Sequence, residues 1–320
     1  MSLLQCAVIG VGYLGRFHAQ KYQQLPLAQL VGVCDVNHTL GQNVAQELNV
    51  PFFADYRDLF GHVDAVSIAA STQQHYRIAR DCLAHGIHVL LEKPMTETLE
   101  QAQELIDLAH THGVTLQIGH LERFNAARIA LEPYLDHPLF IESQRLAPYT
   151  PRGADVNVIL DLMIHDIDLI QAMNPSPIIA IEAQGAPVLS SSIDIASARI
   201  TFANHCIANV SASRVSFKSE RKMRIFQKNS YISVDYQEKK FALFTKGDGE
   251  LFPGIPNIHQ EQSDFAPTDA LFEEIKSFVD SIVHHHPPVV SGQDGYNALA
   301  TAIRIEALIH THLQALHDVT

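Results

Sequence analysis

The feature that most constrains the fold is a glycine-rich loop near the start of the chain, which reads Gly10-Val11-Gly12-Tyr13-Leu14-Gly15. It follows an apolar run at 6–9 that predicts a strand, and it precedes residues 16–24, which have helical character. In this order the first glycine makes the tight turn, the second admits a pyrophosphate, and the third lets the helix approach the strand. The N-terminus of the helix then faces the phosphates. The loop therefore predicts a dinucleotide site that includes Gly10, Gly12, Tyr13, Leu14 and Gly15.

Asp35 is the expected ribose ligand of this site. It ends a predicted strand at 30–34 and lies about twenty residues beyond Gly15, as the dinucleotide-binding pattern requires. A carboxylate at this position accepts hydrogen bonds from both ribose hydroxyls and repels a 2′-phosphate, so the sequence favours NAD over NADP. The alternative is that Asp35 only caps the helix that follows.

Strands and helices alternate through the first 120 residues. Predicted helices separate further predicted strands at 52–53, 65–69, 88–91 and 114–118, which is the pattern of a doubly wound parallel sheet. Ser71 or Thr72 is the expected cap of the helix that runs to residue 84, and we expect both residues at the cofactor. His75 lies in the first turn of that helix, where it either lines the nicotinamide side of the site or packs inside the domain.

A second chemical signal is Glu92-Lys93-Pro94, which ends an apolar run at 89–91. Proline cannot donate to a sheet ladder and favours an extended residue before it, so the strand must end here. Ligands of open α/β sheets bind outside the carboxyl ends of the strands, and we therefore expect Glu92 and Lys93 beside the cofactor. The alternative is an exposed ion pair at the end of a surface strand.

The pattern changes after residue 120. Apolar and β-branched runs follow one another from 178 to 245 without intervening helices, which predicts a large, mostly antiparallel open sheet. Further helices are predicted at 124–135, 158–173, 270–284 and 293–316. The sequence therefore predicts an α/β Rossmann domain with a doubly wound parallel sheet at 1–120, followed by an α+β domain at 121–320 whose last helix packs back on the first domain.

The predicted helix at 158–173 carries polar residues within an apolar sequence. Asp161 and His165 are four residues apart and are therefore expected on one helical face. Because unpaired burial of polar groups is costly, this face must either meet water or line a site. A carboxylate beside an imidazole fixes its tautomer and raises its basicity, which is the arrangement that a general base requires.

A basic segment follows in an otherwise acidic protein of net charge −13. Glu220 is the one acid among its bases, which are Arg214, Lys218, Arg221, Lys222, Arg224 and Lys228. A local positive field suits a phosphorylated or nucleotide-bearing substrate, and we expect Arg214 and Lys218, with Arg123 and Arg152, to hold it. The alternative is a solvated strand–turn–strand edge, where lysines oppose aggregation.

Composition excludes several classes of function. The negative net charge argues against binding of nucleic acid or acidic membranes, and no segment approaches the length of a membrane span. The four cysteines are far apart without a metal-binding spacing, which favours reduced thiols and a cytoplasmic location. The run His284-His285-His286 precedes two prolines and is expected to be a solvated helix end, so no metal site is predicted.

These motifs together resemble the glucose–fructose oxidoreductase and inositol dehydrogenase (Gfo/Idh/MocA) family. The resemblance rests on the glycine loop, on Glu92-Lys93-Pro94 and on the helix with Asp161 and His165, and it covers essentially the whole chain. It implies NAD(P)-dependent oxidation or reduction at a sugar or cyclitol carbon, with Lys93, Asp161 and His165 as catalytic residues. It also implies a homodimer or homotetramer held through the C-terminal sheet.

A narrower resemblance, to the branch of UDP-N-acetylglucosamine 3-dehydrogenases, rests on residues 119–125, 161–168 and 213–227. It implies a 3-keto sugar nucleotide product for lipid A biosynthesis, and it adds Asn125 to the expected substrate residues. The chain departs from many sugar dehydrogenases at 152–157, where a glycine-rich stretch is absent, and at Gln73, where many have proline. A dehydrogenase or reductase of a free sugar or inositol, and a non-catalytic dinucleotide sensor, are the alternatives.

Overall fold

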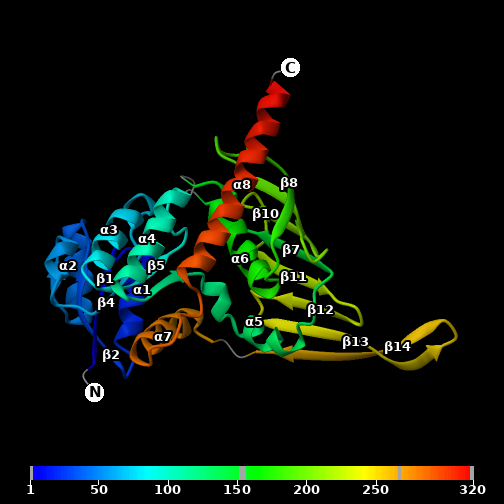
Figure 1. Ribbon diagram of the computed structural model, residues 1–320, viewed down its shortest axis with the longest axis horizontal. Helices are drawn as coiled ribbons and strands as arrows, with labels where there is room; N and C mark the ends of the chain where they lie inside the picture. The colour runs from blue at the N-terminus through cyan, green and yellow to red at the C-terminus, as the bar shows by residue number, and fades with distance from the viewer. Residues whose placement is uncertain (1–2, 151–155, 266–267, 318–320) are drawn as a thin grey trace. The chain divides into compact units, whose positions relative to one another are not determined.

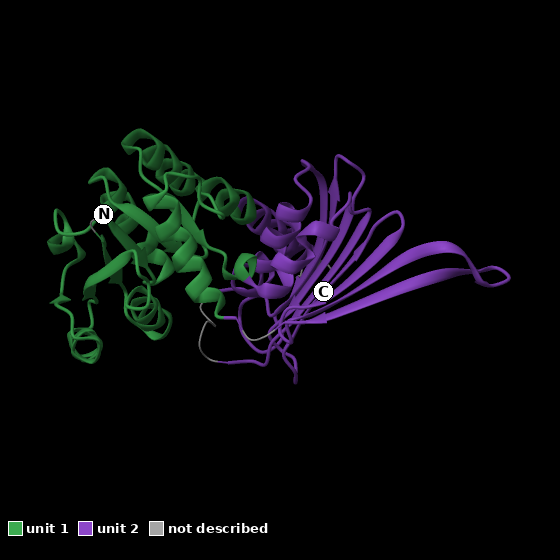
Figure 2. Cartoon of the chain, turned by 90° about the horizontal axis from the view of Figure 1, so that it is seen from below, with its two compact units in different colours: residues 1–124, 269–299 green, residues 125–268, 300–320 purple. Residues whose placement is uncertain are grey.

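The computed structural model describes residues 3–150, 156–265 and 268–317, and the chain forms two compact units. Unit 1 consists of residues 1–124 and 269–299, and unit 2 consists of residues 125–268 and 300–320 (Figure 2). The chain therefore crosses between the units three times, whereas the sequence predicted one boundary, at residue 120.

Unit 1 is built on a six-stranded parallel sheet with the order β3-β2-β1-β4-β5-β6 (Figure 1). Its strands are β1 (Leu4–Ile9), β2 (Ala28–Cys34), β3 (Phe52–Phe53), β4 (Ala65–Ile68), β5 (His88–Glu92) and β6 (Leu116–Gly119). Each pairing is parallel, and β4 and β5 are buried along their apolar residues because helices cover both faces. The strand order reverses between β1 and β4, and this is where open α/β sheets bind their ligands. The predicted Rossmann sheet is confirmed.

The helices of unit 1 follow the predicted alternation closely. They are α1 (Tyr13–Tyr22), α2 (His38–Leu48), η1 (Tyr56–Leu59), α3 (Thr72–Ala84), α4 (Leu99–His112), η2 (Leu121–Phe124), α7 (Ala270–Val283) and the first part of α8 (Gly292–His317). Thr98 caps α4 by accepting a hydrogen bond from the Gln101 amide, and Gly113 ends this helix in the left-handed conformation. These local signals explain why element bounds could be predicted here to within a few residues.

Residues 269–299 return to unit 1 because α7 has an apolar face that packs against the first helices. Leu271, Ile275 and Phe278 share one buried cluster with Tyr22 of α1 and Leu90 of β5. Burying such side chains contributes roughly 1.5–3 kcal/mol each, which favours docking of this segment on unit 1. The sequence predicted that the last helix packs back on the first domain; in the structure α7 and the start of α8, up to residue 299, belong to unit 1.

Unit 2 is built on an eight-stranded sheet with the order β14-β13-β12-β11-β7-β10-β9-β8. Its strands are β7 (Phe140–Leu146), β8 (Ile178–Ala186), β9 (Ile195–Phe202), β10 (Ile207–Ser213), β11 (Glu220–Phe226), β12 (Ser230–Asp235), β13 (Lys240–Phe252) and β14 (Ile255–Asp264). The pair β7 and β10 is parallel, and the other pairs are antiparallel. The predicted mostly antiparallel sheet in an α+β unit is confirmed.

Two strands at the edge of this sheet differ from the prediction. The last predicted run ends at residue 245, whereas β13 continues as far as Phe252, and β14 was not predicted at all. Most residues of β14 are exposed and polar, so its sequence lacks the alternation of apolar and polar residues by which half-buried strands are identified. Pairing with β13 alone defines this strand, and such pairing is a tertiary property.

Both predicted helices at the start of unit 2 are interrupted. The helix expected at 124–135 divides into α5 (Ala126–Leu131) and η3 (Glu132–Tyr134), because Asn125 caps α5 and Pro133 lies in the turn that follows. The helix expected at 158–173 begins as a π-helical turn, η4 (Ile159–Met163), and continues as α6 (Ile164–Met173). Asp161 lies in the π-helical turn, so the four-residue stacking rule used for Asp161 and His165 does not apply there unchanged.

Two buried ion pairs fix the middle of unit 2. Arg145 of β7 donates to Asp166 of α6 over 2.7 Å, and Arg214 donates to Asp194 over 2.7 Å. Asp194 also accepts the backbone N–H groups of residues 188–190. Burial alone raises the pKa of Asp194, but these N–H groups and Arg214 outweigh it and hold the pKa well below its usual range.

Among the helices of the described residues, none combines the length and the apolar composition needed to cross a membrane.

We expect Gly15→Ala to destabilise unit 1, because an added Cβ would lie 1.8 Å from the carbonyl oxygen of Gly10. Overpacking against backbone costs about 1–3 kcal/mol or more. Gly12→Ala is the matched control, since a Cβ there meets no atom within 4 Å. Urea unfolding should show a lower free energy of unfolding for Gly15→Ala and little change for Gly12→Ala; equal stability of the two variants would contradict the packing described for this loop.

For Asp194→Asn we expect a loss of about 3–5 kcal/mol at neutral pH, because Arg214 would keep a buried charge without its partner. Ionised Asp194 stabilises the fold above its unfolded-state pKa of about 3.9, and this contribution is lost as the pH falls from there toward the folded pKa. The difference between wild type and variant should therefore shrink in acid. Asp264→Asn, at an exposed position, is the control, and a pH-independent difference for Asp194→Asn would contradict the assignment.

Candidate cofactor and catalytic site

A cavity of about 770 Å³ lies in unit 1 at the carboxyl ends of β1 to β4. Four of the predicted cofactor residues line it, namely Gly10, Gly12, Asp35 and Ser71. The cavity also lies where the strand order reverses between β1 and β4. Both its lining and its place in the sheet match the dinucleotide site expected from the sequence.

The glycine loop leaves room for a phosphate. Gly10 has φ +82°, and a Cβ there would come within 2.7 Å of the Ala70 nitrogen, so only glycine suits this turn. Gly12 precedes the first turn of α1 and faces open space, which allows a ligand to approach the backbone. The N–H groups of the first turn of α1 are suited to hold a pyrophosphate. These residues therefore fit a dinucleotide.

Asp35 follows β2 and lines the same cavity. Its Oδ2 accepts the N–H of Val11 over 2.8 Å, and its Oδ1 accepts the N–H of Asn37 over 2.7 Å. The residue that caps α2 is Asn37, whose side chain accepts from the Leu40 amide. Asp35 therefore does not serve as the helix cap that was its alternative role, and each of its oxygens retains a second acceptor position for a ribose hydroxyl.

The cavity is also lined by charged and polar residues that the sequence analysis did not select. They are Asp55, Tyr56, Arg57, Gln74, Arg77, Arg80 and Asp81. Arg57 pairs with Asp55 and holds the pKa of Asp55 at about 2, while the Arg77 guanidinium lies 6.0 Å from the centre of the Tyr56 ring. The signal that could have found Asp55 is its place two residues beyond β3, because parallel strands end at the same edge of the sheet.

The other predicted cofactor residues lie outside the lining of this cavity. Tyr13 begins α1 and is 65% exposed, and Thr72 begins α3. Gly15 is buried. His75 is buried, and its ring nitrogens lie 2.9 Å from the Pro94 carbonyl and 3.1 Å from the Ala70 carbonyl. Burial lowers the pKa of His75 despite these contacts. His75 thus has the environment of a packed histidine, and its contact with the cofactor stays a prediction, as do those of Tyr13, Leu14 and Thr72.

Glu92 and Lys93 differ in exposure although they are neighbours. Glu92 ends β5 and is 8% exposed, with its Oε1 3.1 Å from the Nε2 of His18. Lys93 is half-buried and follows at the carboxyl end of the strand. The alternative of an exposed ion pair at this strand end therefore does not describe Glu92.

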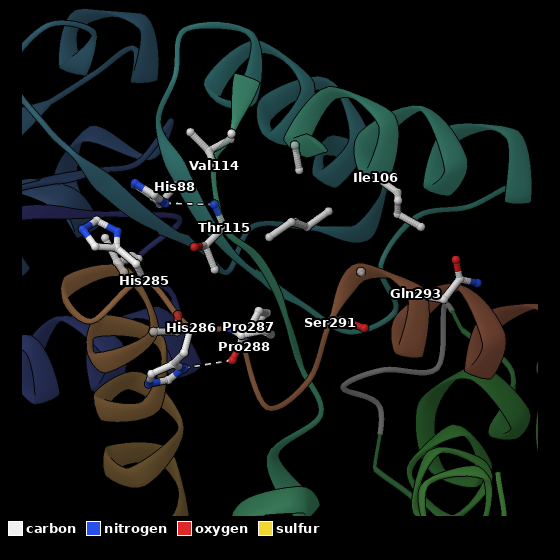
Figure 3. Close-up of a pocket in the computed structure, with 16 residues that line it drawn as sticks. His88, Ile106, Val114, Thr115, His285, His286, Pro287, Pro288, Ser291 and Gln293 are labelled. Carbon is white, nitrogen blue, oxygen red and sulfur yellow. Dashed lines mark hydrogen bonds between the residues drawn. The ribbon is translucent and has the colours of Figure 1, made fainter. Parts of the chain in front are cut away.

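A second pocket of unit 1, of about 460 Å³, lies at the amino ends of β5 and β6 and is drawn in Figure 3. His88 accepts the Thr115 N–H over 2.9 Å, and His286 lies 3.0 Å from the carbonyl of Pro287. Open α/β sheets bind ligands at the other edge of the sheet, which makes the 770 Å³ cavity the candidate cofactor site. His284 ends α7, in agreement with the expected helix end.

Unit 2 contains the predicted general base. Asp161 and His165 are both half-buried, in η4 and α6, and the neighbouring Asp166 of α6 is buried and accepts from Arg145 of β7. Asn125 is buried, accepts the Ala127 N–H and donates to the Tyr236 carbonyl over 3.0 Å, so it has a structural role in capping. Arg152 lies outside the described residues. The catalytic and substrate roles of these residues stay predictions.

The basic segment is largely neutralised within its own unit. Arg214 is 5% exposed and donates to Asp194, to the Val156 carbonyl and to serine hydroxyls. Lys218 and Lys222 both pair with Glu220, and Arg224 pairs with Glu142. In unit 1, Arg123 lies 3.6 Å from Asp294. The two predicted phosphate-binding residues of this segment therefore differ in exposure. The Lys218 side chain is 67% exposed, whereas Arg214 is buried.

Comparison with known proteins identifies the family. Residues 4–120 match the model of an oxidoreductase family with an NAD-binding Rossmann fold, and residues 135–232 match the GFO/IDH/MocA C-terminal domain. The chain is 38% identical over 315 residues to a UDP-N-acetylglucosamine 3-dehydrogenase of Acidithiobacillus ferrooxidans, covering 98% of this chain and 100% of that protein. A crystal structure of that dehydrogenase superposes with a TM-score of 0.91 over 97% of this chain and 99% of that chain.

More distant relatives share the same architecture. A myo-inositol 2-dehydrogenase of Thermotoga maritima is 24% identical, with 92% of this chain and 93% of that protein covered. A scyllo-inositol dehydrogenase of Lactobacillus casei with bound NAD(H) and scyllo-inositol superposes with a TM-score of 0.82 at 20% identity, over 97% of this chain and 98% of that chain, which shows the shared fold. The chain therefore belongs to the GFO/IDH/MocA family of oxidoreductases, with an NAD-binding Rossmann domain followed by the C-terminal domain of that family.

Proposed function

We propose that this protein oxidises the 3-hydroxyl of UDP-N-acetylglucosamine to a 3-keto sugar nucleotide, with NAD as the cofactor. The observation that carries the proposal is the 38% identity, over essentially the full length of both chains, to a UDP-N-acetylglucosamine 3-dehydrogenase. The chain also keeps Lys93, Asp161 and His165, which a protein that only senses dinucleotides would not need.

NAD is proposed to bind in the 770 Å³ cavity, with Gly10 to Gly15 at the pyrophosphate and Asp35 at the adenosine ribose. Bound NAD supplies the acceptor for the hydride that leaves the substrate carbon. Asp35 supports NAD over NADP, because its carboxylate repels a 2′-phosphate. Of the three arginines that line the cavity, Arg57 pairs with Asp55, Arg80 pairs with Asp81, and the Arg77 guanidinium lies 6.0 Å from the centre of the Tyr56 ring, so the proposed preference for NAD rests on Asp35.

His165 is proposed as the general base that removes the proton of the substrate hydroxyl. Asp161 is proposed to orient the imidazole of His165 or to stabilise its protonated form. Lys93 is proposed to stabilise the negative charge that develops on the hydroxyl oxygen. It is also the alternative to His165 as the proton acceptor. In this scheme Glu92 is structural.

For the diphosphate of the substrate, we propose Lys218 as a contact, with Arg123 and Arg152 as further contributors. Arg214 is proposed to anchor this segment through Asp194 and thereby to position Lys218. The Lys218 side chain is 67% exposed, and its ammonium group can exchange its surface partner Glu220 for a phosphate at little cost.

We further propose a homodimer or homotetramer that associates through the sheet of unit 2, and a cytoplasmic location. The four cysteines are free and buried, as a reducing compartment permits.

The catalytic assignment predicts that Lys93→Met and His165→Asn lose turnover while they retain NAD. We expect kcat to fall about 10²–10³-fold for Lys93→Met, because charge stabilisation in a closed site is lost. His165→Asn should lose about 10²–10⁴-fold and the pH dependence of a general base. Lys240→Met and His310→Asn, at exposed positions, are controls. Wild-type turnover in either catalytic variant would remove the corresponding role.

The substrate assignment predicts that UDP-N-acetylglucosamine is oxidised far more efficiently than free N-acetylglucosamine or myo-inositol. Loss of the diphosphate contacts should lower kcat/KM by about 10²-fold or more, and the reaction should prefer NAD over NADP. Mass spectrometry of the product together with NADH absorbance measures both. Equal efficiency on the free sugar would favour a free-sugar dehydrogenase, whereas NAD binding without turnover on any polyol would favour a sensor.

A further inference from the structure

Three ionisable side chains converge inside unit 1, away from the lining of the cofactor cavity. They are His18 of α1, Glu92 at the end of β5 and Glu274 of α7, with exposures of 0%, 8% and 0%. One nitrogen or carboxylate oxygen from each lies within 4.8 Å of the others. The proposed reaction uses none of these three groups directly, yet Glu92 is the residue before Lys93.

Hydrogen-bond partners are unevenly distributed among the three side chains of this cluster. His18 Nε2 lies 3.1 Å from Glu92 Oε1, and the Lys93 N–H donates to Glu92 Oε2 over 3.3 Å. Both carboxylate oxygens of Glu274 are buried and lack a hydrogen-bond partner among the described residues. A buried ionised carboxylate in that situation would be very costly. Glu274 therefore requires a proton or a cation.

The surroundings of the cluster strongly disfavour a state in which both Glu92 and Glu274 are ionised. Ile275, Phe278 and Leu90 belong to the apolar cluster that encloses this part of α7. The titratable groups that face Glu274 are His18 and Tyr22 from α1 and Glu92 from β5. Burial raises the pKa of Glu274 well above its usual range, and the charge of Glu92 raises it further. Like charges at this separation cannot both persist in such an enclosure.

We propose that Glu274 is a neutral carboxylic acid whose O–H donates to Glu92, and that His18 and Glu274 together are positioning residues for the strand end that presents Lys93. In this arrangement Glu92 holds the one negative charge and accepts from His18, from Glu274 and from the Lys93 backbone. A carboxylate with three donors is fixed in orientation. The end of β5 is thereby held from α1 on one side and α7 on the other.

The position of Glu92 leaves it little freedom to move. A Cβ at Gly119, on the neighbouring strand β6, would come within 2.9 Å of the Glu92 carboxyl carbon, so that carboxyl group packs directly on the β6 backbone. Gln117 of β6 also donates to the Glu274 backbone carbonyl over 3.1 Å and so joins α7 to the sheet. A shift of Glu274 would therefore be transmitted to β5 and to Lys93.

A proton is a simpler occupant than a metal ion for this site. Zinc sites with three protein ligands complete their coordination with water, and calcium takes six to eight oxygen ligands, whereas this cluster offers three buried side chains within an apolar enclosure. A shared proton needs no further ligand and no path of entry. Bound metal is therefore the outcome that would overturn the proposal.

The first experiment tests the protonation of Glu274 without any assay of activity. Infrared difference spectra between wild type and Glu274→Gln at neutral pH should contain the C=O band of a protonated carboxyl group in the wild type. Glu273→Gln, at the neighbouring residue on the exposed face of α7, should give no such band. Metal analysis of the wild-type protein should find no stoichiometric ion. Absence of the band, or one equivalent of bound metal, would overturn the proposal.

The second experiment tests positioning and rests on the proposed role of Lys93. Glutamine at 274 retains a donor for Glu92, so Glu274→Gln should keep kcat, whereas Glu274→Leu should lower kcat about 10–10²-fold with the NAD affinity little changed. Equal kcat for both variants, or a loss confined to thermal stability, would overturn positioning. If the protein turns over no substrate, the proposed function fails, while the infrared result still decides the state of Glu274.

Discussion

The contact between Gly10 and Gly15 is the constraint on which unit 1 depends. Because α1 passes so close to the end of β1, its first turn opens directly at the carboxyl edge of the sheet. Asp35 then ties the end of β2 to the same loop through the Val11 N–H. One close backbone approach therefore sets the positions of a helix N-terminus, a carboxylate and a cavity, which together form a site for a dinucleotide.

Several charged residues of this protein are buried in pairs within the fold. The Arg145–Asp166 and Arg214–Asp194 pairs are buried in unit 2, and His18 and Glu92 meet inside unit 1. Each such group is costly to bury alone, so its partners must lie at defined positions. A basic or acidic residue in the sequence is thus weak evidence for a ligand until the location of its partner is known.

The return of residues 269–299 to unit 1 places Glu274 beside His18 and Glu92. The segment brings α7 onto α1 and β5, and with it the carboxyl group that completes the cluster beneath Lys93. A helix that is distant in sequence from Lys93 thereby packs beside the strand end that this lysine follows. The apolar packing of α7 and the hydrogen-bonding state of Glu92 are parts of one arrangement.

By itself, the sequence determined the parallel sheet, the glycine loop with Asp35, the end of β5 and the second, mostly antiparallel sheet. These features depend on local signals, namely glycines at turns, helix caps and the period of apolar residues, which act within about twenty residues. Only the tertiary structure decided that Arg214 pairs with Asp194, that Asp55 lines the 770 Å³ cavity, that β14 forms a strand and that a carboxylate oxygen of Glu274 lies within 4.8 Å of one of Glu92. The physical reason is that the partner of a buried charge, or of an edge strand, is chosen by packing between distant segments, which no local pattern of residues records.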